Sequence, residues 1–273
     1  MDVTPKKISV IGCGWLGLPL AIELVKSNYH VKGSTTKIEK LDELVQASIE
    51  PYHLMLSDEL YVDDKGLFDS DIVVVNVPPG RGGDSIISSY RHKIIQLIDE
   101  LKTHALENVI FVSSTGVYQN TFGTVDEAMI CHPDKASGQA VLAGESVVID
   151  SGLPYTILRM SGLVGGKRQP GNWFKGRRDE PGGDTPVNMV HQKDGIDAII
   201  KVIKSPPRQS NVYNICADEH PIKKEFYAQQ SENIGVESPT FLPGVLPHKL
   251  VSNEKFKSDF EFTYTYPNPI LFR

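Results

Sequence analysis

The chain has 273 residues and a formal net charge of −6, with 40% hydrophobic and 23% charged residues, which is ordinary for a folded protein with a substantial core. No apolar stretch approaches the roughly 18 residues of a membrane span, and no run of lysine or arginine indicates nucleic-acid binding. Three widely separated cysteines, Cys13, Cys131 and Cys216, form neither a zinc ligand set nor a disulfide framework. They indicate a reducing compartment, so we expect a cytoplasmic protein without a metal.

The first expected strand ends in a glycine-rich turn, Gly12-Cys-Gly14-Trp-Leu-Gly17, before an amphipathic segment at 18–26. In a strand–turn–helix unit, the first glycine permits the tight turn, the second lets a pyrophosphate approach the backbone, and the third lets helix and strand pack closely. The helix N-terminus then binds the phosphates. The turn predicts a dinucleotide site; the alternative is a glycine-rich turn that binds nothing. The predicted contacts are Gly12, Gly14, Trp15, Leu16 and Gly17.

The next expected strand, residues 29–33, leads into Ser34-Thr-Thr36-Lys37, with no acidic residue before Glu39. An NAD site usually has a carboxylate here that accepts hydrogen bonds from the ribose hydroxyls. Hydroxyl groups and a lysine suit a 2′-phosphate better, because they supply donors and positive charge. We therefore expect NADP, with NAD as the alternative, and contacts from Ser34, Thr36 and Lys37. The other interpretation of Lys37 is a solvated lysine that begins the next helix.

Strands and helices continue to alternate along the chain. The expected elements are a helix at 38–47, strands at 50–56 and 69–77, a helix at 86–102, a strand at 108–112, a helix at 139–151 and a strand at 155–158. Strict alternation predicts an α/β fold with a doubly wound parallel sheet of the Rossmann type. We expect a dinucleotide-binding domain at 1–160 and a smaller substrate-binding lobe at 161–273, with some segments returning to the main sheet.

Two of these strands end where a cofactor would lie. The strand at 69–77 stops at Pro78-Pro79-Gly80-Arg81, and the strand at 108–112 stops at Ser113-Ser114. Ligands bind at the carboxyl ends of strands in such sheets. We therefore add Val77, Pro78, Pro79 and Ser113 to the predicted cofactor contacts.

With these segments in order, the chain resembles the extended short-chain dehydrogenase/reductase family, the NAD-dependent epimerase and dehydratase group. The matching segments are Gly12–Gly17, Ile110–Tyr118, Asp126-Glu127 with Pro133, Gly144-Glu145, Tyr155–Arg159, Asn188–Ala198, Val212–Ile215 and Asp218–Pro221. The resemblance implies a nicotinamide cofactor across the strand ends. It also implies catalysis by a Ser/Thr, Tyr and Lys trio, in which the tyrosinate is the acid/base.

This chain departs from that trio. Ser114 matches the family serine, but the family's Tyr-x-x-x-Lys pair falls on Ser137 and Val141. A serine hydroxyl has no accessible pKa near 7 and cannot by itself replace tyrosinate as a general base. The sequence is therefore identified as an atypical member, in which the fold is retained and the active-site residues are altered.

The catalytic candidates are Ser114, Tyr118 and His191. Ser114 is placed to orient a substrate oxygen, or it is a turn serine. Tyr118 is a replacement acid, or a packed aromatic residue. His191 is a proton shuttle, or a structural histidine that holds the smaller lobe.

Two functions remain open at this point. One is an NAD(P)-dependent oxidoreductase or epimerase-like enzyme that acts on a hydroxyl or carbonyl group. The other is a non-catalytic NAD(P)-binding sensor or interaction protein. The expected partner is a small-molecule substrate. Five cations around Trp173 and Phe174 could bind an anionic one, and the alternative, slightly favoured, is a solvated loop. No nucleic acid or membrane is expected, and the chain is a monomer or homodimer.

Overall fold

The structure is a computed structural model that describes residues 5–80, 83, 85–206 and 208–273. Arg81, in the loop that we expect beside the cofactor, lies outside these residues. The chain divides into two compact units: unit 1 is Met1–Ser114, Lys135–Leu158 and Ile199–Val212, and unit 2 is Thr115–Asp134, Arg159–Ala198 and Tyr213–Arg273.

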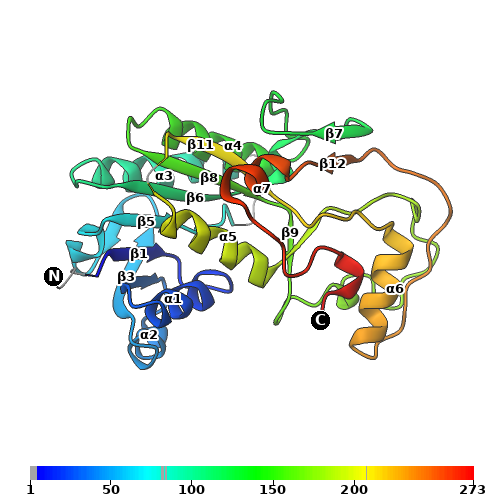
Figure 1. Cartoon of the computed structure of the whole chain (residues 1–273), viewed down its shortest axis with the longest axis horizontal. Helices are drawn as coiled ribbons and strands as arrows, with labels where there is room; N and C mark the ends of the chain where they lie inside the picture. Colours follow the sequence, from blue (N-terminus) through cyan, green and yellow to red (C-terminus); the bar gives the residue numbers. More distant parts are fainter. Residues whose placement is uncertain (1–4, 81–82, 84, 207) are drawn as a thin grey trace. The chain divides into compact units, whose positions relative to one another are not determined.

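An eight-stranded sheet lies mostly in unit 1 (Figure 1). Its spatial order is β11 (Asn211–Ile215), β8 (Tyr155–Met160), β6 (Asn108–Ser114), β5 (Ile72–Val75), β1 (Lys7–Ile11), β2 (His30–Thr35), β3 (Glu50–Leu56) and β4 (Leu60–Val62). From β1 the chain first builds outward through β2 and β3, and then returns to build the other side from β5. The topological switch point therefore lies between β1 and β5, where ligands bind in sheets of this kind.

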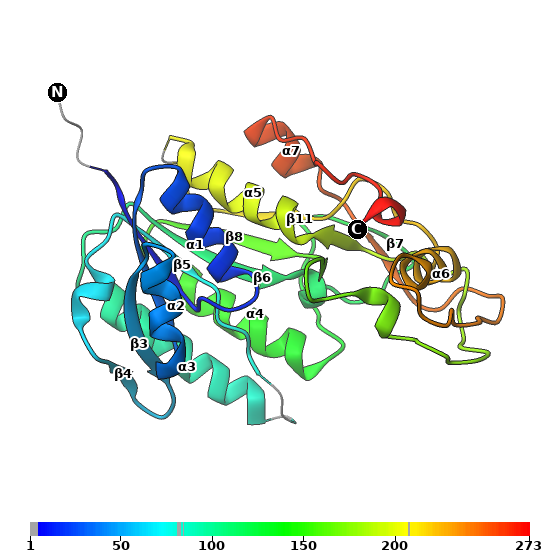
Figure 2. The same ribbon diagram turned by 90° about the horizontal axis from the view of Figure 1, so that it is seen from below.

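Helices cover both faces of this sheet (Figure 2). One face carries α1 (Gly17–Lys26) and α2 (Leu41–Gln46), which follows the 3₁₀ turn η1 (Ile38–Lys40). The other face carries α3 (Ser85–Leu101) and α4 (Ala136–Ile149). These two helices pack closely at Gly144, where an added Cβ would lie 2.9 Å from a ring carbon of Tyr90. The doubly wound fold predicted from the alternation of elements is confirmed.

Several local predictions differ from the structure; for example, the strand expected at 69–77 is only Ile72–Val75. Strand β4 was not expected; it pairs antiparallel with β3 at the sheet edge, because residues 57–59 return the chain directly without a crossover helix. Helix α4 begins at Ala136 rather than at residue 139, since Lys135 is still in extended backbone. The helix therefore includes Ser137 in its first turn.

Unit 2 is built from short strands and helices. Parallel pairs join β9 (Gly162–Val164) to β10 (Met189–His191) and β7 (Gly123–Val125) to β12 (Lys249–Val251). The remaining elements that lie in it or enter it are η3 (Thr115–Val117), η4 (Pro170–Asn172), α5 (Gln192–Lys204), α6 (Lys223–Asn233), α7 (Glu254–Phe260) and η5 (Pro269–Leu271); η2 (Lys65–Phe68) belongs to unit 1. Its core gathers Val164, Met189, Phe226, Tyr227 and Phe272.

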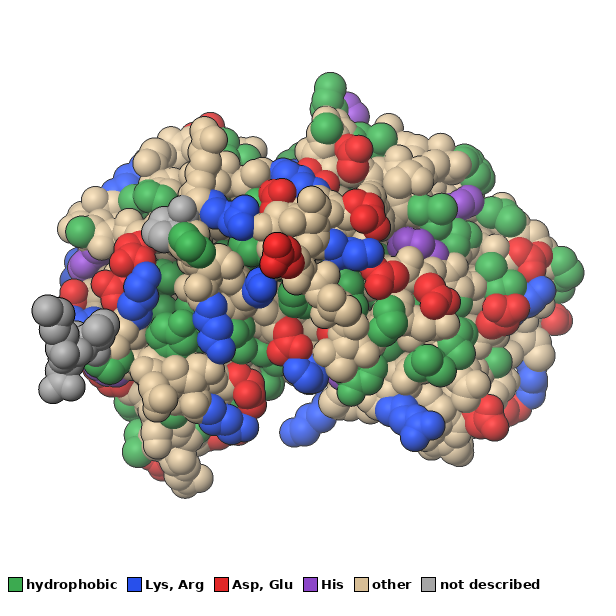
Figure 3. All heavy atoms as spheres, in the orientation of Figure 1, with side chains coloured by type: hydrophobic (Ala, Val, Ile, Leu, Met, Phe, Trp, Pro, Cys, Tyr) green, Lys and Arg blue, Asp and Glu red, His purple; other side chains and the backbone are tan. Residues whose placement is uncertain are grey.

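The surface carries charges of both signs. In Figure 3, blue and red side chains are interspersed across the visible face, and no continuous basic area is present on it. Within the described residues, no helix combines the length and the apolar character that crossing a bilayer requires.

Candidate functional site

The three glycines of the first turn each meet a different physical requirement. Gly12 has a φ of +97°, and an added Cβ would lie 2.5 Å from the Asn76 carbonyl oxygen. At Gly17 an added Cβ would lie 2.2 Å from the Gly12 carbonyl oxygen, so only glycine allows this approach of helix to turn. Gly14 is exposed and has no neighbouring atom within 4 Å of its Cβ position. The crowding at two glycines and the open space at the third match the requirements of a pyrophosphate cradle.

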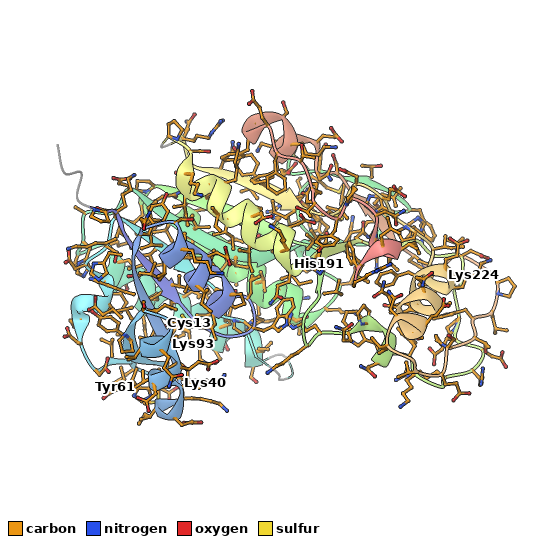
Figure 4. The ribbon with its side chains drawn as sticks, turned by 60° about the horizontal axis from the view of Figure 1, so that its bottom comes forward. Cys13, Lys40, Tyr61, Lys93, His191 and Lys224 are labelled. Carbon is orange, nitrogen blue, oxygen red and sulfur yellow. The ribbon has the colours of Figure 1, made fainter. Side chains whose placement is uncertain are left out.

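The glycine turn is held from two neighbouring strands. The Gly12 N–H donates to the Ser34 hydroxyl oxygen at 3.0 Å, and the Cys13 N–H donates to the Ser34 carbonyl at 2.7 Å. From the other side, the Asn76 side-chain amide donates to the Gly12 carbonyl at 3.1 Å. Burial raises the pKa of the Cys13 thiol to about 12, so this cysteine (Figure 4) is an inert packing residue.

Helix α1 begins at Gly17, and no acidic residue lies in its first turn. The positive end of its dipole is therefore uncompensated beside the open space at Gly14. Trp15 is half-buried and Leu16 is buried in the turn. The cradle fits the pyrophosphate of a dinucleotide, with Gly12, Gly14 and Gly17 forming its walls.

The residues predicted to meet the adenosine ribose fall into two groups. Ser34 is only 1% exposed, and its hydroxyl oxygen accepts a hydrogen bond from the Gly12 N–H, so this side chain stabilises the turn. Thr36 and Lys37 are exposed directly after β2. Of the three, these two are the ones available to a ligand.

The strand ends on the other side of β1 are also braced from within unit 1. The Tyr90 hydroxyl donates to the Val77 carbonyl at 2.7 Å, which fixes the backbone before the exposed Pro78 and half-buried Pro79. The buried Ser113 hydroxyl donates to the carboxylate of Glu145 on α4. Ser114, the last residue of β6, is half-buried.

Helix α4 carries Ser137 and Val141, the two residues on which we expect the family's tyrosine and lysine positions to fall. Ser137 is exposed in the first turn, and Val141 one turn later is 7% exposed. Neither side chain is an acid or base near neutral pH.

Tyr118 lies in a buried polar cluster of unit 2. Its hydroxyl donates to the Asn214 side-chain oxygen at 2.9 Å and accepts from the Arg159 guanidinium at 2.7 Å. The side chain is 1% exposed, and burial raises its pKa to about 12. Both polar partners are thus supplied by the protein, which favours the packing interpretation of Tyr118.

His191 is also buried in unit 2, beside the C-terminal segment (Figure 4). Its Nδ1 accepts from the Lys193 N–H at 3.2 Å, and its ring centroid lies 4.1 Å from that of Tyr266 and 5.4 Å from that of Phe272. Burial lowers its pKa, so the ring is neutral. Nearby Asp194 is fully buried and accepts from the N–H groups of Thr265 and Tyr266 at 2.7 and 3.0 Å. These contacts favour the structural interpretation of His191.

Some of the cations around Trp173 and Phe174 form ion pairs with acidic side chains of unit 2. Arg177 pairs with Glu180 at 3.5 Å and lies over the Phe174 ring, and Arg178 pairs with Glu237. All these groups are largely solvated, as expected for surface ion pairs. Within the described residues, no group of three or more His, Cys, Asp or Glu side chains is arranged to hold a metal ion.

Two residues that brace the strand ends were missed in the sequence. Asn76 is the only polar residue in the run from Ile72 to Val77, and its position directly after a buried strand was the available signal. Glu145 is a buried carboxylate on a helix face, recognisable only once Ser113 is placed against it.

The comparisons with known proteins agree with this geometry. A family described as NAD(P)H-binding matches residues 12–206, which begin at the first glycine of the cradle. The chain belongs to this family. It is 34% identical over 272 residues to Protein YeeZ of Escherichia coli (strain K12), an alignment that covers 97% of this chain and 98% of that protein.

Solved structures identify the fold of this family member. UDP-glucuronic acid 4-epimerase from Bacillus cereus in complex with NAD has a TM-score of 0.81 at 20% identity, covering 97% of this chain and 93% of that chain. UDP-N-acetylglucosamine 4-epimerase from Bacillus cereus has a TM-score of 0.79 at 18% identity, over 97% and 96%. A functionally unknown conserved protein from Silicibacter pomeroyi DSS has a TM-score of 0.76 at 20% identity, over 97% and 96%. The predicted resemblance to NAD-dependent epimerases and dehydratases is confirmed as a shared fold.

Proposed function

We propose that this protein is an NADPH-dependent oxidoreductase, or an epimerase- or dehydratase-like enzyme, that acts on a hydroxyl or carbonyl group of a small anionic metabolite. The observation that carries the proposal is the glycine cradle, in which Gly12 and Gly17 are crowded and Gly14 is open. Membership in an NAD(P)H-binding family supports the same cofactor class.

The preference for NADPH rests on the end of β2. Thr36 and Lys37 are exposed there, and Lys40 follows in the first turn after the strand. A hydroxyl and two cations favour a 2′-phosphate by donating hydrogen bonds and by charge, whereas a carboxylate at this place would repel it.

Ser114 is the proposed catalytic residue. When bound, the nicotinamide supplies or accepts the hydride. A serine hydroxyl at the end of β6 donates a hydrogen bond to a substrate carbonyl oxygen and so stabilises the negative charge that develops there. Tyr118 and His191 take structural roles in this proposal, because the Tyr118 hydroxyl and Nδ1 of His191 already have partners in unit 2.

A second candidate is a non-catalytic NAD(P)-binding sensor. Ser137 and Val141 favour it, because they stand where the resembling family has its tyrosine and lysine, and Val141 is buried. Both candidate functions require the cofactor cradle, but only the enzyme converts a substrate.

Thermal unfolding with NADPH, with NADH and without cofactor tests the cofactor. A ligand at a hundred times its dissociation constant stabilises the folded state by about 2.7 kcal/mol. We expect a clear shift with NADPH, a smaller one with NADH, and a loss of the difference in Lys37→Glu. Lys175→Glu, an exposed lysine in unit 2, is the control. Equal shifts with both cofactors would refute the NADPH preference, and no shift with either would refute the proposed function.

A panel of anionic aldehydes and ketones, followed by NADPH absorbance, tests catalysis. We expect Ser114→Ala to reduce kcat about 10²-fold or more with little change in cofactor binding, since one oxyanion donor typically contributes this much. Tyr118→Phe should leave kcat within a few-fold and lower the unfolding free energy by about 1–3 kcal/mol, because a buried guanidinium loses its acceptor. Cofactor stabilisation without turnover across the panel would favour the sensor.

A further inference from the structure

Asn76 occupies the switch point of the sheet, directly after β5 and beside β1. Its main-chain N–H donates to the Ile11 carbonyl at 2.9 Å, and its side-chain amide donates to the next carbonyl along the chain, that of Gly12, at 3.1 Å. One residue therefore binds two consecutive carbonyls at the point where β1 becomes the glycine turn.

Asn76 also packs against the glycines that shape the cradle. The Cβ position of Gly12 lies 2.5 Å from the Asn76 main-chain oxygen, and that of Gly17 lies 3.0 Å from Asn76 Nδ2. The amide thus fills the space between the start of the turn and the start of α1. The Gly12 carbonyl also accepts from the Gly14 N–H at 2.8 Å, so the Asn76 amide is the side-chain donor of the two groups that bind it.

The orientation of this amide is determined by its partner. A carbonyl oxygen facing the Gly12 carbonyl would be repelled, so Nδ2 must face it and donate. This donation fixes the Gly12 peptide in the conformation with a φ of +97°, which only glycine adopts readily.

We propose that Asn76 is the positioning residue of the cofactor cradle: its amide holds the Gly12 carbonyl and keeps the glycine turn in the phosphate-binding conformation before the cofactor arrives. The inference rests on the proposed cofactor function. It assigns to Asn76 a role in preorganisation, which lowers the entropic cost of binding.

The chain provides a reporter for the turn that does not depend on activity. It has two tryptophans, Trp15 inside the turn and Trp173 in unit 2. In a Trp173→Phe background, the emission of the cofactor-free protein reports the surroundings of Trp15 alone. Asn76→Ala should change this emission and weaken NADP⁺ binding at least 10-fold.

Asn108→Ala is the matched control. Asn108 is the first residue of the neighbouring strand β6, at the amino end of the strands and away from the glycine turn. Its side-chain amide donates to the Thr156 hydroxyl at 3.1 Å. We expect this variant to lose stability without changing the Trp15 emission or the NADP⁺ affinity. A general loss of packing would instead affect both variants alike.

Asn76→Asp separates the hydrogen bond from packing. A carboxylate cannot donate to the Gly12 carbonyl, whereas a protonated carboxyl has nearly the shape of the amide and can. NADP⁺ affinity of Asn76→Asp should therefore recover by about 10-fold between pH 8 and pH 5, relative to wild type at each pH. Asn76→Ala should show no such recovery, and if it fails to fold, the pH series decides.

The outcomes distinguish this inference from the function on which it rests. Wild-type protein that binds none of NADP⁺, NADPH and NADH overturns the proposed function and this inference with it. Wild-type binding combined with unchanged affinity and unchanged Trp15 emission in Asn76→Ala overturns the positioning role alone.

Discussion

The residues of the glycine turn differ in what their small size provides. Gly17 is required by the fold, because its Cβ position lies 2.2 Å from the Gly12 carbonyl oxygen. Gly14 is not, because nothing in the described structure lies within 4 Å of its Cβ position. The same residue type thus serves stability at one position and ligand approach at another.

This difference predicts opposite effects of two alanine substitutions. Gly14→Ala should leave the unfolding free energy within about 0.5 kcal/mol, since the site is open and exposed, and should weaken NADPH binding at least 10-fold by filling the phosphate space. Gly17→Ala should destabilise the cofactor-free protein by about 1–3 kcal/mol through steric overlap. Chemical unfolding and a fluorescence titration measure the two effects. Unchanged NADPH affinity in Gly14→Ala would contradict the cradle.

The sequence located these glycines but not the directions of nearby side chains. Ser34 and Ser113 lie near the carboxyl ends of β2 and β6, where ligand contacts are expected, yet their hydroxyls bond to Gly12 and Glu145. The alternation along a strand predicts which face a side chain is on. It does not say whether a tertiary neighbour has already used its polar atom.

At the scale of elements, the C-terminal segment is held by the residues that precede and begin α5. Asp194 accepts from two N–H groups of the segment, and the neutral ring of His191 packs against Tyr266 and Phe272. The sequence marked His191 as a candidate but offered no role for the C-terminal segment. The hydrogen bond between the Thr265 N–H and Asp194 joins residues 71 positions apart in the sequence, so only the tertiary structure shows it.

The burial of His191 predicts a pH dependence of stability. Burial lowers its pKa in the folded state, and the same holds for His220. The unfolded chain therefore binds the proton first as the pH falls below the ordinary histidine value of about 6.5. The stability is fully present above that value and is lost toward the lower folded-state pKa, by at most about 1.4 kcal/mol per pH unit for each group.

Urea unfolding at pH 7.5 and 5.5 measures this loss. His191→Gln keeps a polar acceptor but does not titrate, so it should lose less stability between the two pH values than wild type does. A His191→Gln variant with the full wild-type pH dependence would show that the ring is not kept neutral by the fold.

At the scale of the whole molecule, each unit has its own core and its own tryptophan. Phe272 is 2% exposed in the core of unit 2, and the Gln230 amide donates to the carbonyls of Pro269 and Phe272 at 3.3 and 3.2 Å. Trp173 neighbours Tyr227 of the same core, with ring centroids 6.3 Å apart. The last five residues therefore contribute directly to the folding of unit 2.

Deletion of residues 269–273 should destabilise unit 2 by several kcal/mol, because it empties an aromatic site and leaves a buried amide without partners. The unfolding transition reported by Trp173 should move to lower denaturant, while NADPH should still quench Trp15. Limited proteolysis should then cut unit 2 first. Loss of the Trp15 response together with that of Trp173 would show that the cradle depends on unit 2.

The sequence by itself determined the doubly wound sheet and the place of the cradle, because both follow from local patterns: the period of apolar residues, and glycines at fixed spacing after a strand. The tertiary structure decided which polar groups remain available to a ligand. Thr36 and Lys37 are exposed directly after β2, whereas Ser34, Tyr118 and His191 are bonded or packed within their units. The physical reason is that a buried polar group needs a partner. The partners lie 22 residues away along the chain for Ser34, and 41 and 96 residues away for Tyr118.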